Sequence, residues 1–273
     1  MADLAHILLR RQHDVLFATL NRPDTRNALA PEMVVELADI VHVAESDDKV
    51  RALVLRGAGG FFCAGGNVVN FQVRLSAQDS NDDPIAARNR DFGRFMQRLA
   101  ALPIPLIAVV EGGAMGGGMG LACAADLVLA TQDARFALSE TSLGIIPAQI
   151  APFVVARVGQ RAALRLGLFG ERLSGEDAQA LGLVDELAAD TAHLDALLAQ
   201  WLTRLCACAP GANRALKPLL RRCGHESDDT LLDDAAQQFA ACMRHEGAEG
   251  IAAFREKRPA AWRQAFGTAD VHA

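Results

Sequence analysis

A glycine-rich stretch between two apolar segments constrains the fold of this chain more than any other feature. Residues 106–110 are all apolar and are typical of a buried strand. Six glycines then fall between Gly112 and Gly120, and residues 121–125 favour a helix. A helix that begins among glycines presents unpaired N–H groups, and no Cβ keeps a negatively charged ligand atom away from them. The stretch therefore predicts either an oxyanion site or close packing of a helix on a sheet.

Length and charge limit the classes of protein to consider. A chain of 273 residues can form one large or two small domains with a substantial core. The net charge of -6 argues against nucleic acid as the main partner, because binding to phosphates needs a basic face. No apolar run approaches the ~20 residues of a membrane span, and the N-terminus does not resemble a signal peptide. The six cysteines lack the spacing of a zinc site, so we expect reduced thiols in a cytoplasmic protein and no metal.

The first half of the chain alternates predicted strands and helices. Residues 7–10 and 15–20 predict a hairpin, and Pro31 opens a helix with apolar positions at helical spacing. Residues 50–56 predict a strand that enters a glycine turn, and residues 84–102 predict a helix that two prolines end. The polar segment 74–84 between them predicts a mobile loop.

Beyond Pro147 the pattern changes. Residues 126–131 predict a strand before this point, but after it we expect no further strands and four or five helices. Ser174 and Asp177 have the spacing of a helix-capping pair. No linker rich in proline, glycine or serine separates this half, so it should pack on the strand-rich core or on a neighbouring chain.

Two backbone positions and one carboxylate stand out as a candidate catalytic group. Ala64 follows a predicted strand and several glycines, and Gly117 lies at the head of the central helix. Two N–H groups from separate loops that converge on one oxygen stabilise an enolate, typically by a factor of roughly 10²–10³ each. Glu140 is the one carboxylate in a segment of small and apolar neighbours. It is either a general base or a structural glutamate.

Four motifs in this order resemble the crotonase superfamily, the enoyl-CoA hydratase/isomerase fold. Residues 62–67 (FCAGGN) resemble the first oxyanion loop of that family, and residues 116–126 resemble the second. Residues 136–147 resemble the catalytic segment, and residues 254–259 (FREKRP) resemble a C-terminal helix motif. The resemblance runs from the first hairpin to about Trp262.

The resemblance implies an α/β fold, the ClpP/crotonase-like spiral of ββα turns. Residues 1–200 would form the core with the active site, and residues 201–273 would form a helical region used in a trimer or a dimer of trimers. Ala64 and Gly117 would hold the thioester oxygen, Glu140 would be the general base and later the acid, and Phe254 and Lys257 would contact the CoA of an adjacent subunit. No separate cofactor is expected, because CoA is part of the substrate. The residues implied to line the CoA path are Arg26, Asn27, Ala28, Ala64, Gly65, Gly66, Asn67 and Gly117.

Two positions depart from the pattern of typical hydratases. Gly120 stands where they carry another glutamate, and the uncharged Asn67 stands where an aspartate often closes the first loop. A lone Glu140 still permits hydration, in which it delivers water to Cβ, or isomerisation, in which it moves a proton between Cα and Cγ. The interpretation is an enoyl-CoA hydratase-type lyase. The alternatives are a Δ3,Δ2-enoyl-CoA isomerase and a non-catalytic member that binds acyl-CoA or associates with RNA.

Two segments are similar to one branch of the family. Residues 118–123 and 147–155 resemble isohexenylglutaconyl-CoA hydratase, a relative of methylglutaconyl-CoA hydratase that also has glycine at the position of Gly120. That branch acts in acyclic terpene catabolism, so the resemblance implies a branched glutaconyl-CoA substrate.

Several other residues have simpler interpretations. Glu111 ends a strand and is predicted to be structural. Arg157, Arg161 and Arg165 form a stripe that is typical of a solvated or subunit-facing helix face, although one of them could pair with a substrate carboxylate. The side chains predicted to line an acyl pocket or the core are Met115, Met119 and Phe153.

Overall fold

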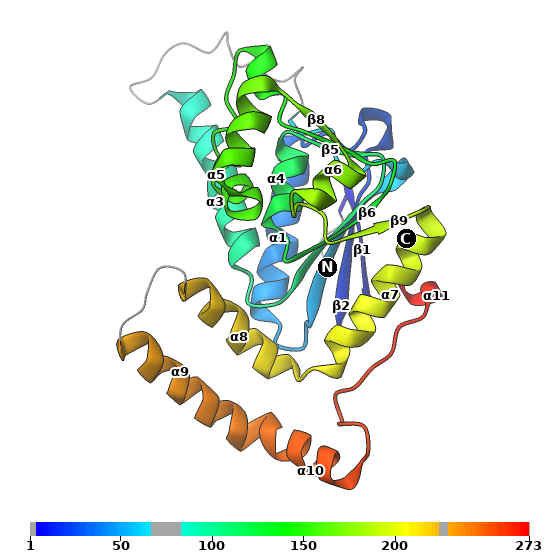
Figure 1. The fold of residues 1–273 in the computed structure, drawn as a ribbon, viewed down its shortest axis with the longest axis vertical. Coiled ribbons are helices and arrows are strands. Elements are labelled where there is room, and N and C mark those ends of the chain that lie inside the picture. The colour runs from blue at the N-terminus through cyan, green and yellow to red at the C-terminus, as the bar shows by residue number, and fades with distance from the viewer. Residues whose placement is uncertain (1–3, 67–82, 224–228, 273) are drawn as a thin grey trace.

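The computed structural model describes residues 4–66, 83–223 and 229–272. The predicted helix cap at Asn67 and nearly all of the predicted loop 74–84 lie outside these residues. The body of the molecule is a twisted sheet with helices on both faces, and a group of helices from the C-terminal part extends below it (Figure 1).

The main sheet has six strands in the order β1-β2-β3-β4-β6-β9. The first pair is antiparallel, which confirms the predicted hairpin, and all other neighbours are parallel. The carboxyl ends of β3 and β4 therefore lie side by side at one edge of the sheet, where loops of α/β proteins commonly bind ligands. The strands are β1 (Ile7–Gln12), β2 (Val15–Leu20), β3 (Ala52–Gly57), β4 (Leu106–Val110), β6 (Leu127–Thr131) and β9 (Glu186–Ala188).

A second, smaller sheet leads into the segment that carries Glu140. Its order is β5-β7-β8, with β5 (Gly113–Met115) parallel to β7 (Arg135–Ala137) and β8 (Arg172–Ser174) antiparallel to β7. Strand β5 lies inside the glycine stretch, and the short helix η3 (Glu140–Leu143) follows β7. The prediction of no strands after Pro147 is wrong, because β8 and β9 follow it. Strands of three residues are too short to show a hydrophobic period.

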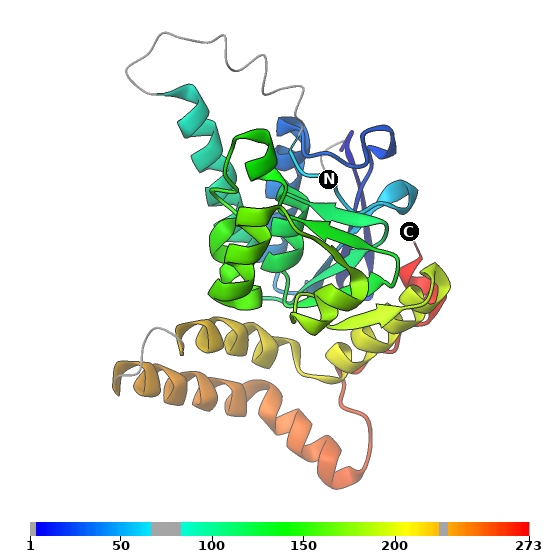
Figure 2. The same ribbon diagram turned by 45° about the horizontal axis from the view of Figure 1, so that its top comes forward.

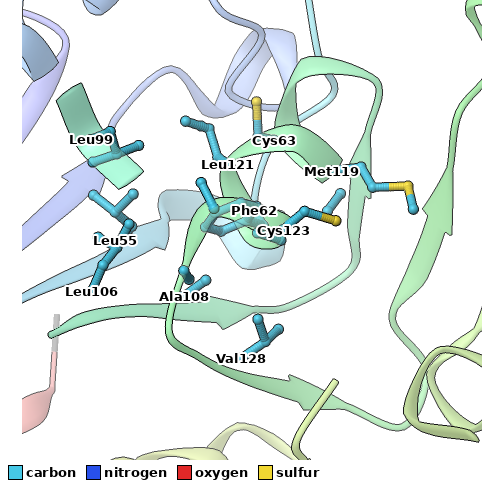
Figure 3. Close-up of a cluster of buried hydrophobic side chains, with 14 of the residues drawn as sticks. Leu55, Phe62, Cys63, Leu99, Leu106, Ala108, Met119, Leu121, Cys123 and Val128 are labelled. Carbon is cyan, nitrogen blue, oxygen red and sulfur yellow. The ribbon is translucent and has the colours of Figure 1, made fainter. Parts of the chain in front are cut away.

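Two apolar cores lie on opposite faces of the main sheet. Side chains alternate along β3, so that Leu53 and Leu55 enter one core while Ala52 and Val54 enter the other. The larger core packs the sheet against α1 (Pro31–Ser46), α3 (Pro84–Ala101), α4 (Gly117–Ala124) and α5 (Ala151–Phe169). Figure 3 shows its centre, where Phe62 and Cys63 of the first loop meet Met119, Leu121 and Cys123 of α4. The second core packs the sheet against α7 (Thr191–Ala207) and α11 (Thr268–Val271).

The predicted helices of the first half are present, and α4 begins among the glycines as predicted. Ser174 and Asp177 form the predicted capping box at the start of α6 (Gly175–Ala180). The predicted boundary at residue 200 falls inside α7, whose side chains belong to the second core. The structure has more helices after Pro147 than expected. Helix α8 (Pro210–Arg222) lies along the body, where Lys217 pairs with Asp126, whereas α9 (Asp229–Cys242) and α10 (Ala248–Glu256) form an arm that leaves the body (Figure 2). Among the described residues no helix is long and apolar enough to cross a membrane.

Candidate active site

Two loops leave the neighbouring ends of β3 and β4 and are bonded to each other. The Cys63 N–H donates to the Gly113 carbonyl at 3.1 Å, and the Met115 N–H donates to the Cys63 carbonyl at 2.9 Å. At Gly65 the φ angle is 87°, and a Cβ there would lie 2.6 Å from the Met115 carbonyl oxygen. Glycine is therefore required at position 65, where the first loop meets the second, since any side chain there would push the two loops apart.

The structure corrects the predicted role of Ala64 in this pair of loops. Its N–H already donates to the Arg26 carbonyl at 2.9 Å, so it is not free to bind a thioester oxygen. The Gly66 N–H, two residues on, makes no hydrogen bond to the residues that the structure describes. A Cβ on Gly117 would lie 3.8 Å from the Gly66 nitrogen, which places the two glycines together. In the sequence, only the lack of a side chain points to Gly66 as a donor, and the neighbouring Gly65 lacks a side chain too.

Gly117 supplies the second N–H group. It is the first residue of α4, and Gly116 before it has a φ angle of 49°. The Gly116 N–H donates to the Ala137 carbonyl at 2.9 Å, whereas the Gly117 N–H has no acceptor in the described part of the chain. The amides at the first turn of a helix carry the positive end of its dipole. Gly66 and Gly117 together can therefore hold one anionic oxygen.

Glu140 lies beside these amides, as the resemblance of residues 136–147 to the catalytic segment of the crotonase family implies. A Cβ on Gly116 would lie 2.8 Å from Glu140 Oε1, so the carboxylate contacts the residue just before α4. Its other oxygen, Oε2, is buried and has no hydrogen-bond partner among the described residues. Burial raises the pKa of Glu140 above its usual value, although a hydrogen bond from its own backbone opposes the shift. A buried polar atom without a partner is costly, so Glu140 Oε2 is placed to accept a hydrogen bond from a ligand that enters the site.

The position at which typical hydratases carry another glutamate is filled by an apolar side chain. A Cβ on Gly120 would lie 2.3 Å from Ile150 Cγ2 and 2.7 Å from Ile150 Cβ. Ile150 is buried at the start of α5, and α4 and α5 pack closely. The site therefore presents one carboxylate and, at the place of residue 120, a hydrocarbon wall.

This geometry agrees with what comparison with known proteins finds. The enoyl-CoA hydratase/isomerase family model matches residues 10–265. The chain belongs to the enoyl-CoA hydratase/isomerase family. It has the crotonase fold and is an enoyl-CoA hydratase-type enzyme.

Individual relatives cover nearly the whole chain. A 1,2-epoxyphenylacetyl-CoA isomerase of Escherichia coli is 34% identical, over 92% of this chain and 96% of that one. Among solved structures, an enoyl-CoA hydratase/isomerase from Marinobacter aquaeolei is 46% identical, with a TM-score of 0.91, over 95% of this chain and 99% of that one. Pseudomonas aeruginosa AtuE has the same identity and TM-score, over 95% of this chain and 100% of that one.

In this member of the enoyl-CoA hydratase/isomerase family, residues 26–28 are implied to line the CoA path, but they differ in how accessible they are to a ligand. Asn27 is buried, and its Nδ2 donates to the carbonyl oxygens of Phe61 at 2.6 Å and Ala58 at 2.9 Å. Its side chain therefore holds the first loop and is not available to a ligand. Arg26 is exposed, with its guanidinium carbon 5.7 Å from the centre of the Phe61 ring, and Ala28 is half-buried.

The remaining predicted site residues lie elsewhere. Phe254 is 85% exposed on α10, and Lys257 caps that helix with a φ angle of 55°. Both belong to the arm that leaves the body (Figure 2), so the structure does not bring them to Glu140 of the same chain. Asn67 lies outside the described residues. In the part of the chain that is described, no group of three histidine, cysteine or acidic side chains could hold a metal.

Several other predicted residues have structural contacts. The Arg157 guanidinium donates to the Leu183 carbonyl and pairs with Asp185, and Arg165 pairs with Glu171. Met119 belongs to the larger core. Glu111 is structural as predicted, because its carboxylate accepts hydrogen bonds from Arg56 and Thr191 at 2.7 Å each.

Proposed function

We propose that this protein adds water across the double bond of an α,β-unsaturated acyl-CoA thioester. The observation that carries the proposal is the buried Oε2 of Glu140, which lies beside the Gly66 and Gly117 amides; neither this oxygen nor these amides have a hydrogen-bond partner in the part of the chain that the structure describes. A thioester carbonyl between the Gly66 and Gly117 N–H groups would place the acyl chain next to this carboxylate. The two amides take the role first assigned to Ala64 and Gly117.

The reaction uses Glu140 twice. Its carboxylate accepts a proton from water while the oxygen of that water bonds to Cβ of the enoyl group. The electron pair of the double bond moves to Cα and the thioester oxygen, and the enolate is held by the Gly66 and Gly117 N–H groups. The protonated Glu140 then returns the proton to Cα, which restores the carboxylate. The raised pKa of Glu140 suits this alternation, because it brings the acid and base forms closer in free energy.

The test compares the protein with its Glu140→Gln variant on crotonyl-CoA and on branched glutaconyl-CoA thioesters. We expect loss of enoyl absorbance with the protein and a fall in kcat of at least ~10³-fold with the variant, which keeps the shape of the side chain but cannot accept the proton. Binding of the acyl-CoA, measured by calorimetry, should change little. A variant with the rate of the unmodified protein would contradict the role given to Glu140.

Isomerisation is the second candidate, and Ile150 favours it. With Ile150 at the position of residue 120, no second carboxylate helps to hold the water, whereas a proton shuttle between Cα and Cγ needs only Glu140. Incubation with a 3-enoyl-CoA separates the two reactions. A 2-enoyl product without any hydroxyacyl-CoA would identify an isomerase, and tight binding without turnover of any thioester would identify a non-catalytic member.

The substrate and the assembly are further parts of the proposal. The similarity of residues 118–123 and 147–155 to isohexenylglutaconyl-CoA hydratase supports a branched glutaconyl-CoA of acyclic terpene catabolism as the substrate. The exposed Phe254 and the neighbouring Lys257 on the arm support contact with the CoA of an adjacent subunit, in a trimer or a dimer of trimers.

A further inference from the structure

A buried network of charged side chains lies behind the two glycine loops, on the face of the sheet that α7 covers. Arg56 Nε donates to Glu111 Oε2 at 2.7 Å, and an Arg56 terminal nitrogen donates to Asp195 Oδ1 at 2.6 Å. Arg56 and Glu111 are each 7% exposed, and Asp195 is 2% exposed. Although burial by itself lowers the pKa of Arg56, its bonds to the two carboxylates outweigh this, so the guanidinium stays charged.

The remaining carboxylate oxygens of the network are also occupied. Thr191 Oγ1 donates to Glu111 Oε1 at 2.7 Å, and His272 Nδ1 lies 2.7 Å from Asp195 Oδ2. Thr191 and Asp195 are one turn apart on α7, while His272 directly follows α11. Helix α7 therefore fixes Arg56 through Asp195 and Glu111 through Thr191, and His272 in turn holds Asp195.

The network stands at the strand ends from which both loops start. Arg56 is followed by Gly57, the last residue of β3, and Glu111 directly follows β4. The main chain of Glu111 also holds the first loop, because its carbonyl accepts the Phe62 N–H at 2.9 Å. The Arg56–Glu111 pair thus sets the spacing of the loops that carry Gly66 and Gly117.

We propose that Arg56 is a positioning residue for the oxyanion amides: by binding Glu111 and Asp195 it fixes the strand ends from which the Gly66 and Gly117 loops leave. This inference rests on the proposed function. A buried ion network adds little to the free energy of unfolding, because the cost of removing its charges from water offsets most of their mutual attraction. Such a network can, however, hold the surrounding backbone in one geometry. Since the amides act on the charge that develops in the transition state, loosening them lowers kcat more than it raises KM.

The first experiment measures kcat and KM of two conservative variants. In Arg56→Lys the charge stays, but a lysine lacks the planar fork that binds two carboxylates. In Glu111→Gln the shape stays, but the negative charge that pairs with Arg56 is lost. For each we expect kcat to fall about 10- to 100-fold, since small displacements of catalytic groups cost this much, with KM within ~3-fold. Thr191→Val, which removes only one donor, should lower kcat about 3-fold.

The matched control lies at the opposite end of β4. Lys217 is mostly buried, pairs with Asp126 and donates to the Ile104 carbonyl at 2.8 Å, and Asp126 accepts the N–H of Leu106, where β4 begins. Lys217→Gln should lower the melting temperature to a degree similar to that of Arg56→Lys but leave kcat unchanged. An equal loss of kcat in Lys217→Gln would show a general effect of instability and overturn the inference.

The second experiment needs no turnover. Butanoyl-CoA with a ¹³C-labelled thioester carbonyl has no double bond to react, and hydrogen bonds to that carbonyl lower its infrared stretching frequency. We expect a lowered frequency with the protein and a smaller shift with Arg56→Lys and Glu111→Gln at saturating ligand. Variants with the full shift and an unchanged kcat would overturn the inference and leave the proposed function standing. A protein without turnover and without any shift would overturn the proposed function itself.

Discussion

At the scale of single residues, the proposed chemistry depends on Glu140 being held close to the amides without being neutralised by a protein partner. Its Oε1 contacts the glycine that precedes α4, and its Oε2 is buried without a partner among the described residues. The place of Glu140 next to a glycine loop could be predicted from its segment. The choice of Gly66 over Ala64 could not, because it depends on which N–H the Arg26 carbonyl occupies, and that bond joins segments far apart in the sequence.

The raised pKa of Glu140 predicts a specific pH dependence of activity. Hydration needs the carboxylate, so kcat/KM should fall as the pH drops through the raised pKa, above the value of about 4.3 that is usual for glutamate. A pH–rate profile of the protein measures this acid limb. If the midpoint of this acid limb lay at or below the usual pKa of glutamate, Glu140 would not be buried in solution.

The same shift predicts an effect on stability with a definite sign. Because the folded pKa is raised, the folded state favours the protonated acid, and stability falls as the pH rises through that pKa. Glu140→Gln removes this loss, so it should melt roughly 2 °C higher than the unmodified protein at pH 7. At a pH of about 3, well below both the usual and the raised pKa, the acid is protonated in both states and the difference should vanish, and calorimetry at the two pH values tests it.

At the scale of elements, α4 and α5 owe their close packing to a glycine. The long elements with a clear period, such as α1, α3 and β4, could be predicted from the sequence, and so could the start of α4. The short strands β8 and β9 could not, because their pairing partners and not their own residues define them. The contact of Gly120 with Ile150 likewise appears only when the two helices are brought together.

A pair of substitutions tests that contact. Gly120→Ala places a methyl group into Ile150 and should destabilise the protein by about 1–3 kcal/mol through overpacking, despite the better helix propensity of alanine. Ile150→Ala alone should also destabilise, by about 2–4 kcal/mol, because it leaves a cavity. In the double variant the methyl group partly fills that cavity, so urea denaturation should show a total loss smaller than the sum. Strictly additive losses would contradict the contact.

At the scale of the whole molecule, the body buries two cores while the C-terminal arm leaves large apolar side chains exposed. Leu232, Phe239 and Phe254 are 67%, 68% and 85% exposed on α9 and α10. A helical region after the core could be predicted from composition, but its separation from the body could not, since no linker marks it. Apolar patches of this kind usually mark a protein interface.

We therefore expect the protein to be a trimer or hexamer of 29.0 kDa chains at micromolar concentration, which sedimentation equilibrium measures. Replacing Phe239 and Phe254 with glutamate should shift the mass toward one chain, because two charges would then be buried in the interface. Arg94→Glu, on the exposed face of α3, serves as a charge-changing control and should keep the assembly. A monomer before any substitution would contradict the proposed oligomer.

The main-chain origin of the Gly66 and Gly117 donors has a consequence for how such a protein can diversify. Amide hydrogens are present whatever side chains surround them, so exchanging the residues that meet the acyl tail leaves the electrophilic part of the catalyst untouched. Leu29, whose Cδ1 would lie 3.0 Å from a Cβ on Gly117, is a natural place for such exchange. The preference for an acyl chain can then be changed by substitution without altering the amides that would stabilise the enolate.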